Sequence, residues 1–285
     1  MKREDLPIDI DLSGKVAVVT GAGGVLCSAM AKALAAAGAK VALLDRNVAA
    51  AERQAEEIRR DGGVAKGYEA NVLEKSSLAA CHAGVLADFG KCDILINGAG
   101  GNNPAATTDK EYFEQGDIEG SAKSFFDLTY EGVSFVFDLN FMGTFLTVQE
   151  FARDMTGRSG CNILNISSMN AFTPLTKIPA YSGAKAAISN LTQWLAVHFA
   201  KAGVRVNAIA PGFLSTAQNA ALLWNADGTP TERTKKIIAA TPMGRFGEPD
   251  ELLGSVLFLV SDRAAGFITG IVLPIDGGFS AYSGV

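Results

Sequence analysis

Short apolar segments alternate along the chain with longer segments of helical pattern, and this alternation limits the fold more than any other feature. The apolar segments are rich in Val, Ile and Leu, which is typical of strands buried on both faces. They lie near residues 15–20, 40–45, 64–68, 93–97, 161–166, 204–210 and 270–274. Helical segments lie between them, near residues 25–37, 48–60, 75–89, 134–155, 180–202 and 248–260. The pattern predicts an α/β fold with a doubly wound parallel sheet of about seven strands and helices on both faces.

The length and composition fit one domain of this class. The chain has 285 residues, of which 48% are hydrophobic and 19% are charged, so a large core can form between the sheet and its helices. We therefore expect residues 1–285 to form a single domain. Two segments are longer than a connection requires, which predicts insertions near residues 101–131 and 212–246. The first carries seven acidic residues against two lysines, which favours a solvated rim or a subunit contact.

Charge and composition also exclude several classes of function. A net charge of −5 without a basic run argues against nucleic acid as a partner. No segment reaches the roughly 20 apolar residues that cross a bilayer, and the first residues lack the apolar stretch of a secretory signal. We therefore expect no membrane partner and a cytoplasmic location. The cysteines and histidines have no metal-ligand spacing, which predicts reduced thiols and no metal site; they are Cys27, Cys81, Cys92, Cys161, His82 and His198.

A glycine-rich turn joins the first expected strand to the first expected helix. The strand segment K-V-A-V-V-T runs into G-A-G-G at residues 21–24 and then into a helical segment. The free amides and the dipole of a helix N-terminus favour an anion such as a phosphate. Asp45 ends the second strand segment, 21 residues after Gly24, which is the distance at which an acid reaches the adenosine ribose. This combination predicts a Rossmann-type dinucleotide site; a turn that serves only packing is the alternative.

Asp45 also bears on which dinucleotide is used. A carboxylate accepts hydrogen bonds from the ribose diol and repels a 2′-phosphate, which favours NAD. Arg46 follows directly and offers a receiver for that phosphate, so NADP remains the less favoured alternative.

Tyr181 and Lys185 stand one helical turn apart in P-A-Y-S-G-A-K and would share one helix face. An unperturbed tyrosine has a pKa of about 10, and a nearby ammonium lowers that pKa toward the working range. Ser168 closes the strand-like run C-N-I-L-N-I-S-S, so its hydroxyl would point at the same substrate oxygen. The Y-x-x-x-K spacing is weak evidence alone. With a dinucleotide site it predicts oxidation of an alcohol or reduction of a ketone.

Four further motifs complete a recognisable set: L-I-N-G-A-G at 95–100, D-L-N-F-M-G around Asn140, N-A-I-A-P-G-F-L-S-T at 207–216 and L-P-I-D-G-G at 273–278. Together with the segments above they resemble the short-chain dehydrogenase/reductase family over essentially the whole chain. The resemblance implies a catalytic tetrad in which Tyr181 is the acid/base and Ser168 positions the substrate oxygen. It also implies that Lys185 holds the nicotinamide ribose and lowers the Tyr181 pKa, and that Asn140 anchors a proton-relay water.

The same resemblance implies the cofactor contacts. Asn71 and Val72 match the adenine-contact pair, although Asn71 is equally explained as a cap of the helix starting near Glu74. The usual third glycine of the turn is replaced by Cys27, from which we expect a slight outward shift of the helix and modest cofactor affinity. The full expected set is Gly21, Gly23, Gly24, Val25, Leu26, Asp45, Arg46, Asn71, Val72, Asn97, Gly98, Ala99, Tyr181, Lys185, Pro211, Gly212, Phe213 and Thr216.

Within the family, three segments are most similar to the D-mannonate oxidoreductase (fructuronate reductase) branch: G-A-G-G-N-N-P-A-A-T-T-D, S-S-M-N-A-F-T-P-L-T-K-I-P-A-Y and the tail F-S-A-Y-S-G-V. The polar residues before Tyr181 suit a polyol, and Lys177 or Arg245 would pair with a carboxylate; a solvated Lys177 is the alternative. The hypothesis is interconversion of D-mannonate and D-fructuronate, with substrate contacts from Asn102, Asn103, Ser168, Asn170, Lys177 and Tyr181. Another sugar or polyol dehydrogenase, such as a gluconate 5-dehydrogenase, or a non-catalytic dinucleotide sensor are the rivals.

The resemblance also implies a homotetramer. One interface would pair the helices near residues 134–155 and 180–202, and the C-terminal strand and tail would form the other. In that family the region equivalent to residues 212–246 closes over the substrate and excludes water.

Overall fold

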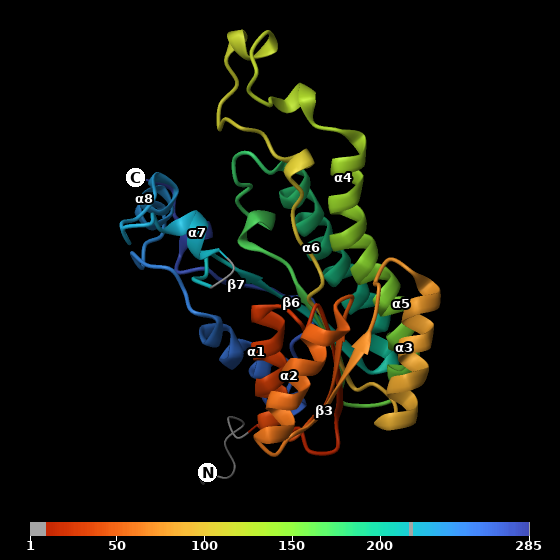
Figure 1. The fold of residues 1–285 in the computed structure, drawn as a ribbon. Coiled ribbons are helices and arrows are strands. Elements are labelled where there is room, and N and C mark those ends of the chain that lie inside the picture. The colour runs from red at the N-terminus through yellow and green to blue at the C-terminus, as the bar shows by residue number, and fades with distance from the viewer. Residues whose placement is uncertain (1–9, 217–218, 285) are drawn as a thin grey trace.

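The computed structural model describes residues 10–216 and 219–284, whose strands form one seven-stranded sheet in which every pairing is parallel (Figure 1). The strand order is β3-β2-β1-β4-β5-β6-β7. The strands are β1 (Val16–Thr20), β2 (Lys40–Asp45), β3 (Val64–Glu69), β4 (Ile94–Asn97), β5 (Cys161–Ile166), β6 (Val204–Pro211) and β7 (Val272–Ile275). The predicted fold class is confirmed, and each predicted strand lies within two residues of an observed one.

Helices cover both faces of this sheet and bury two separate apolar layers. One layer packs α1 (Val25–Ala36), α2 (Val48–Arg60) and α9 (Leu253–Val260) against the sheet. The other packs α3 (Lys75–Asp88), α5 (Gly143–Met155) and α6 (Pro179–Phe199). Successive side chains of a strand point to opposite faces, so each central strand contributes to both layers. The remaining α-helices are α4 (Tyr130–Phe137), α7 (Ala220–Leu223), α8 (Glu232–Ala240) and α10 (Asp262–Ala265).

The helix expected over residues 134–155 is interrupted. It begins earlier, at Tyr130, and a π-helical turn over Asp138–Met142 separates α4 from α5. The turn contains Asn140, whose side-chain amide donates to Val136 O at 2.8 Å and to Gly101 O at 2.7 Å. Single π-helical turns of this kind are frequent at functional sites. The helical pattern of residues 134–155 does not reveal the extra residue of this turn.

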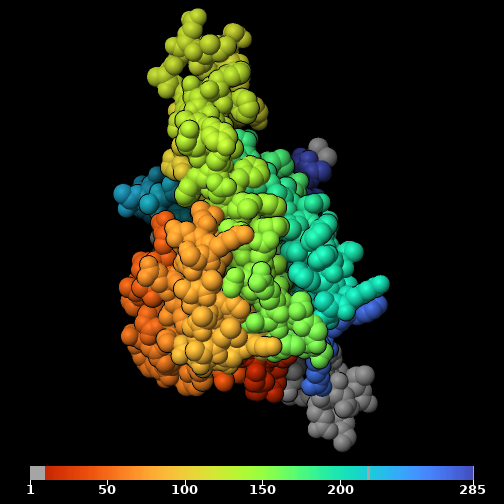
Figure 2. All heavy atoms as spheres, turned by 90° about the vertical axis from the view of Figure 1, so that its right-hand side faces the viewer, coloured from red at the N-terminus to blue at the C-terminus, as the bar shows by residue number. Residues whose placement is uncertain are grey.

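The first insertion forms an arm that projects from the body of the protein above α4, yellow-green in Figures 1 and 2. Its turns are 3-10 helices stabilised by capping boxes at Glu114 with Asp117 and at Ser124 with Asp127. The arm exposes large apolar side chains, most of them aromatic: Tyr112, Phe113, Ile118, Phe125 and Phe126. The surface of the arm is therefore apolar as well as acidic.

The second insertion carries α7 and α8, which pack on a small apolar cluster of Leu223, Ile237 and Phe246 beside Phe213. In Figure 1 both helices lie on the far side of α6 from α5. Thr231 caps α8 by accepting from Thr234 N. This segment therefore has a core of its own next to the carboxyl ends of β6 and β7.

Three absences can be stated for residues 10–216 and 219–284. No helix in this part is long and apolar enough to cross a membrane. No group of three or more His, Cys, Asp or Glu side chains in this part is arranged so that it could hold a metal ion. The four cysteines are buried and unpaired. His82 of α3 lies instead between two carboxylates of α5, with 2.9 Å from each ring nitrogen to Glu150 and to Asp154.

Candidate active site

The strand order of the sheet predicts where a ligand binds. Successive strands run outward in opposite directions from β1 and β4, so the loops after these two strands part at the sheet's switch point. Ligands of open α/β sheets bind in the crevice at the carboxyl ends of the strands at such a point. Most of the predicted cofactor residues lie at or just beyond the carboxyl ends of β1, β2, β3, β4 and β6, and the predicted Ser168 follows β5.

The glycine turn has no space for side chains. Gly21 has φ +68°, and a Cβ there would lie 3.0 Å from the backbone of Ala99 in the loop after β4. Gly23 donates its N–H to Asp45 Oδ2 at 3.0 Å, and a Cβ on Gly23 would meet the same carboxylate. Glycine is therefore required where this turn approaches its neighbours.

The N-terminus of α1 fits a phosphate group. Its N-cap is Gly24, and no side chain caps the first turn. The first amides of a helix have no intrahelical acceptor, so they remain available to an anion at the positive end of the helix dipole. The backbone geometry of this turn therefore suits a dinucleotide.

Cys27 is accommodated in a different way from the one expected. The thiol occupies the space beside Gly98, where a Cβ would overlap the sulfur. Because Gly98 has no side chain, the loop after β4 leaves room for the Cys27 thiol. A third glycine in α1 would provide the same room, so no outward shift of α1 is needed. Burial raises the pKa of Cys27 to about 12, so the thiol is neutral.

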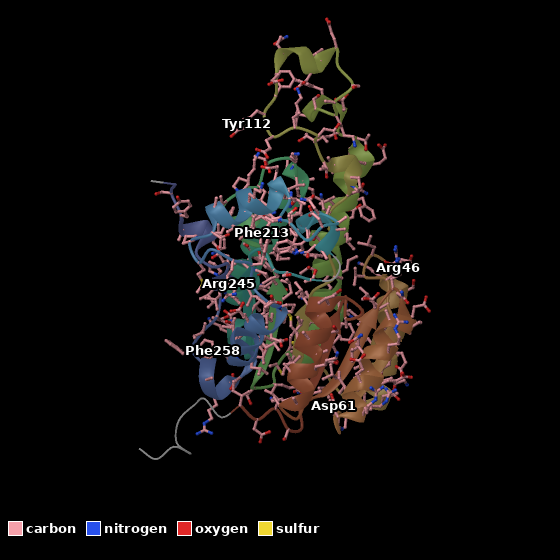
Figure 3. The ribbon with its side chains drawn as sticks, turned by 60° about the vertical axis from the view of Figure 1, so that its left-hand side comes forward. Arg46, Asp61, Tyr112, Phe213, Arg245 and Phe258 are labelled. Carbon is pink, nitrogen blue, oxygen red and sulfur yellow. The ribbon has the colours of Figure 1, made fainter. Side chains whose placement is uncertain are left out.

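Asp45 and Arg46 differ in what they reach. Asp45 is partly buried, and its second oxygen accepts from Asn47 N at 2.8 Å. Arg46 is exposed at the surface after β2 (Figure 3).

Asn71 shapes the turn before α3 by accepting from Leu73 N at 3.1 Å, whereas Glu74 is the N-cap position. The expected capping role of Asn71 is thus a turn next to the helix rather than the cap itself.

Three residues of the predicted tetrad, Ser168, Tyr181 and Lys185, lie close together. Lys185 Nζ lies 5.5 Å from the centroid of the Tyr181 ring and donates to Ile166 O at 2.8 Å. Ser168 caps the 3-10 turn that follows β5, accepting from Asn170 N at 3.3 Å. Its hydroxyl acts on the Tyr181 phenol, whose pKa it lowers. The helical spacing of Tyr181 and Lys185 therefore gives the predicted shared face.

Asn140 forms a two-point link to the loop after β4. Gly101 N donates to Asn140 Oδ1 at 3.2 Å, and Asn140 Nδ2 donates to Gly101 O at 2.7 Å. A Cβ on Gly100 would meet Asn140 Oδ1 at 2.6 Å and Lys185 Nζ at 3.3 Å. The π-helical turn, the loop after β4 and α6 therefore converge at Gly100.

The pKa of Tyr181 moves opposite to the direction expected from the lysine. Burial raises it, and the Ser168 hydroxyl only partly offsets that rise. Burial also lowers the pKa of Lys185 to about 8, because an ammonium enclosed in protein loses its hydration. The expectation that the neighbouring ammonium lowers the pKa of Tyr181 is therefore wrong, because loss of solvent around the phenol has the larger effect.

A cavity of about 520 Å³ lies between α8 and the segment that precedes Tyr181. Its wall includes the segment just before Tyr181, the base of the arm, Phe213 after β6 and the exposed face of α8. Three cations line it, Lys177, Arg233 and Lys236, together with the carboxylates of Glu111 and Glu232. Only Lys177 of these was predicted. Arg233 and Lys236 lie more than fifty residues further along the chain, and no local pattern pointed to them.

The other predicted substrate residues lie differently. Asn102 Nδ2 donates to Thr107 Oγ1 at 2.9 Å and Asn103 accepts from Ala105 N at 2.8 Å, so both shape their own loop. Asn170 is buried, and its Oδ1 has no partner within the described part of the chain. Arg245 makes two 2.7 Å contacts with Glu251 and lines a separate small cavity, so its pairing with a substrate carboxylate is not supported.

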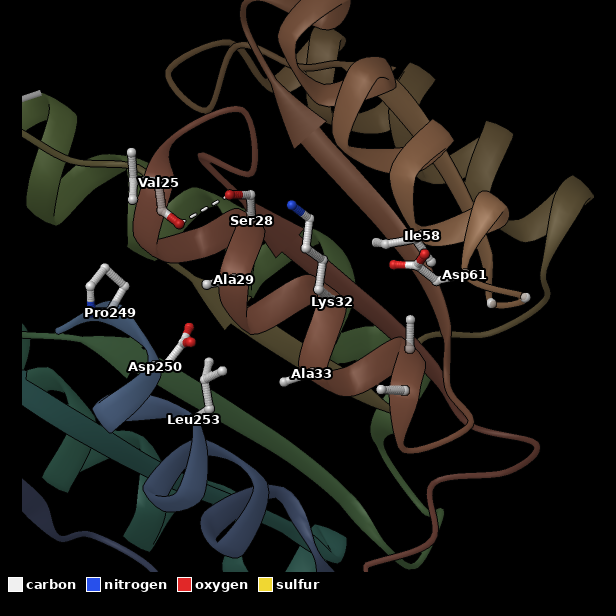
Figure 4. A pocket seen from close by; sticks show the side chains of 14 residues that line it. Val25, Ser28, Ala29, Lys32, Ala33, Ile58, Asp61, Pro249, Asp250 and Leu253 are labelled. Carbon is white, nitrogen blue, oxygen red and sulfur yellow. Dashed lines mark hydrogen bonds between the residues drawn. The ribbon is translucent and has the colours of Figure 1, made fainter. Parts of the chain in front are cut away.

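A larger cavity, of about 700 Å³, lies elsewhere. It runs along the outer side of α1 toward Pro249 and Leu253 and contains none of the tetrad (Figure 4). Lys32 lines it and is paired with Glu57 at 2.6 Å. Because none of the predicted tetrad lines this cavity, its volume is no argument for placing the reaction there.

Known proteins resemble this chain over nearly its full length. Residues 21–280 match the family model described as enoyl-(acyl carrier protein) reductase. An uncharacterized oxidoreductase of Haemophilus influenzae is 60% identical over 275 residues, which cover 96% of each chain. The uncharacterized oxidoreductase UxuB of Bacillus subtilis is 51% identical over 280 residues, covering 98% of this chain and 100% of UxuB.

Solved structures agree with the fold. The crystal structure of a proposed D-mannonate oxidoreductase from Haemophilus influenzae, with bound NAD, is 58% identical with a TM-score of 0.94, and the match covers 98% of this chain and 99% of the other. A more distant relative, the 2-dehydro-3-deoxy-D-gluconate 5-dehydrogenase of Pseudoalteromonas atlantica, is 34% identical over 271 residues, covering 94% and 96%. Similarity thus extends to proteins named for work on sugar acids.

Proposed function

Because the chain belongs to the short-chain dehydrogenase/reductase family of oxidoreductases, we propose that it interconverts a sugar-acid alcohol and its ketone, with NAD as the cofactor. D-mannonate and D-fructuronate are the best candidates. The observation that carries the proposal is the grouping of Tyr181, Ser168 and Lys185, next to a cation-lined cavity whose wall includes the segment just before Tyr181. The NAD bound by the 58%-identical relative supports the choice of cofactor.

The proposed chemistry divides between the cofactor and the tetrad. When bound, NAD would supply the acceptor for the hydride that leaves the carbinol carbon. Tyr181, ionised to the phenolate, would take the hydroxyl proton as the carbonyl forms, and in reverse the neutral phenol would return a proton to that oxygen. Ser168 donates a hydrogen bond that holds the same oxygen. Lys185 binds the nicotinamide ribose, and Asn140 fixes the loop through Gly101 at the point where protons pass from Lys185 toward solvent.

The remaining proposed cofactor contacts follow the strand ends. The glycine turn and Val25 and Leu26 would hold the pyrophosphate, and Asp45 the adenosine ribose. The adenine would lie by Asn71 and Val72. The nicotinamide would lie between the residues at the end of β4 and those at the end of β6, which are Asn97, Gly98 and Ala99 on one side and Pro211, Gly212, Phe213 and Thr216 on the other.

Asp45→Ala is expected to lower the preference for NAD over NADP by about 10- to 100-fold, because a charged hydrogen-bond acceptor for the ribose and a repulsive charge are both removed. The measurement is kcat/KM with each cofactor. Arg46→Ala is the matched control and should leave the KM for NAD nearly unchanged. An unaltered preference in Asp45→Ala would remove the carboxylate from the explanation.

Substrate identity is tested by following NADH absorbance across hexonates, hexuronates, neutral polyols, steroid alcohols and fatty-acyl ketones. D-mannonate or D-fructuronate is expected to give the highest kcat/KM. Highest activity with D-gluconate or a deoxy-gluconate would favour the gluconate 5-dehydrogenase alternative. The similarity to the 34%-identical 2-dehydro-3-deoxy-D-gluconate 5-dehydrogenase supports that alternative. Turnover confined to steroid or fatty-acyl compounds would exclude sugar acids.

We also propose a homotetramer in the cytoplasm. Exposed apolar side chains on α4 and α6, including Phe135, Trp194 and Val197, offer one interface. Gel filtration with light scattering would measure the assembly directly.

A further inference from the structure

We propose that Lys177 and Arg233 together form the subsite that binds the carboxylate of the substrate. This inference rests on the proposed function, since it assumes that the substrate is an acid. It replaces Arg245 with a residue that sequence patterns did not suggest, and it assigns to α8 a role in selecting the substrate.

The two cations come from different parts of the chain and line one cavity. Lys177 lies four residues before Tyr181, and Arg233 lies in the first turn of α8. The charges of both reach the carboxylate of Glu111: its pKa is lowered mainly by the hydrogen bond from Lys236 and further by Lys177 and Arg233. Both positive charges therefore act on the same side of the cavity.

The other charged groups of the wall are already paired. Lys236 Nζ contacts Glu111 Oε1 at 2.8 Å, and Lys235 Nζ contacts Glu232 Oε1 at 2.7 Å. Within residues 10–216 and 219–284, the side chains of Lys177 and Arg233 make no hydrogen bond or ion pair. Two cations that line one cavity and make no ion pair of their own fit an anionic ligand, and the planar guanidinium of Arg233 suits a carboxylate.

The backbone at Lys177 supports a function for this position. It is the one non-glycine residue of the described chain with a positive φ, +71°. Such a conformation is unfavourable for an L-residue, and backbone strain of this kind is found most often at ligand and active sites. Thr108 N donates to Lys177 O at 2.9 Å, which holds the strained segment against the base of the arm.

A carboxylate held by both side chains would join α8 to the segment that precedes the catalytic Tyr181. An acidic substrate would thus be held at one end by these cations and at the reacting oxygen by Ser168 and Tyr181. A neutral polyol would make only the second set of contacts.

The test compares Arg233→Gln, Lys177→Gln and the double variant with Lys235→Gln, a matched control on α8 whose lysine does not line the cavity. Steady-state assays use D-mannonate and the uncharged mannitol as substrates, each with NAD. Each single variant should raise the KM for D-mannonate by about 10- to 100-fold with little change in kcat, as expected for a lost charged hydrogen bond. Kinetics with mannitol should be unchanged, and Arg233→Lys should recover part of the affinity.

The outcomes separate this inference from the proposed function. Normal KM values for D-mannonate in both Gln variants would overturn the subsite and leave the sugar-acid activity intact. Equal losses with mannitol and D-mannonate would also overturn it, since they would indicate a structural effect. If the unaltered enzyme turned over no hexonate or hexuronate, the proposed function would fail, and the subsite with it.

Discussion

Tyr181→Phe is expected to lower kcat/KM by about 10²- to 10⁴-fold, which is the usual contribution of a positioned acid/base. The change removes only the phenolic oxygen, and the ring beside Lys185 stays in place. NAD affinity and the free energy of unfolding should therefore change little. Turnover of the hexonate by NADH absorbance and NAD binding by calorimetry would measure the two effects separately.

Tyr130→Phe is the matched control, since that tyrosine is 81% exposed at the start of α4 and should leave turnover unaltered. Full activity in Tyr181→Phe would contradict acid/base catalysis by this phenol. It would instead favour a dinucleotide sensor, which should be indifferent to the substitution.

Lys185→Met is expected to abolish most turnover and yet to stabilise the cofactor-free protein. Lys185 is 4% exposed, and its pKa falls from 10.5 to about 8 on folding because burial penalises the ammonium. Below pH 8 both the folded and the unfolded chain carry the proton, so the folded protein holds a charge that destabilises it by about 3 kcal/mol. Loss of the hydrogen bond to Ile166 O reduces the gain on substitution.

The sign of the pH dependence follows from the same shift. Between pH 8 and 10.5 the unfolded chain binds more protons at this position than the folded protein does, so the free energy of unfolding of the unaltered protein rises with pH. Lys185→Met should lack this rise. Urea unfolding at pH 7 and pH 10 measures the difference, and Lys32→Met on the surface of α1 is the control. Identical pH slopes in both variants would show that Lys185 is not the group responsible.

Much of the fold could be predicted because its signals are local. Buried parallel strands are short runs of Val, Ile and Leu, and each strand was found within two residues. Tyr181, Lys185 and Ser168 could be placed because helical spacing and a strand end fix their relative positions. Glycine at position 21 follows from the close approach of Ala99, and the sequence shows the glycine even though it does not show the neighbour.

The missed features depend on contacts distant in sequence. Arg233 reaches the cavity only because α8 packs near Lys177, and nothing around residue 233 indicates that neighbour. The π-helical turn depends on the hydrogen bonds between Asn140 and Gly101. The sequence shows the charge of Lys185, which predicts a lowered pKa for Tyr181. It does not show the loss of solvent around the phenol, which raises that pKa.

The arrangement of Cys27 against Gly98 has a consequence for engineering. Replacing an unusual residue by the one most common among relatives is a frequent route to higher stability. Here a lone glycine at position 27 would leave unfilled volume beside the loop that follows β4, because the thiol already takes up what Gly98 leaves free. The two positions form a unit of complementary sizes, and a designer should alter them together or leave both alone.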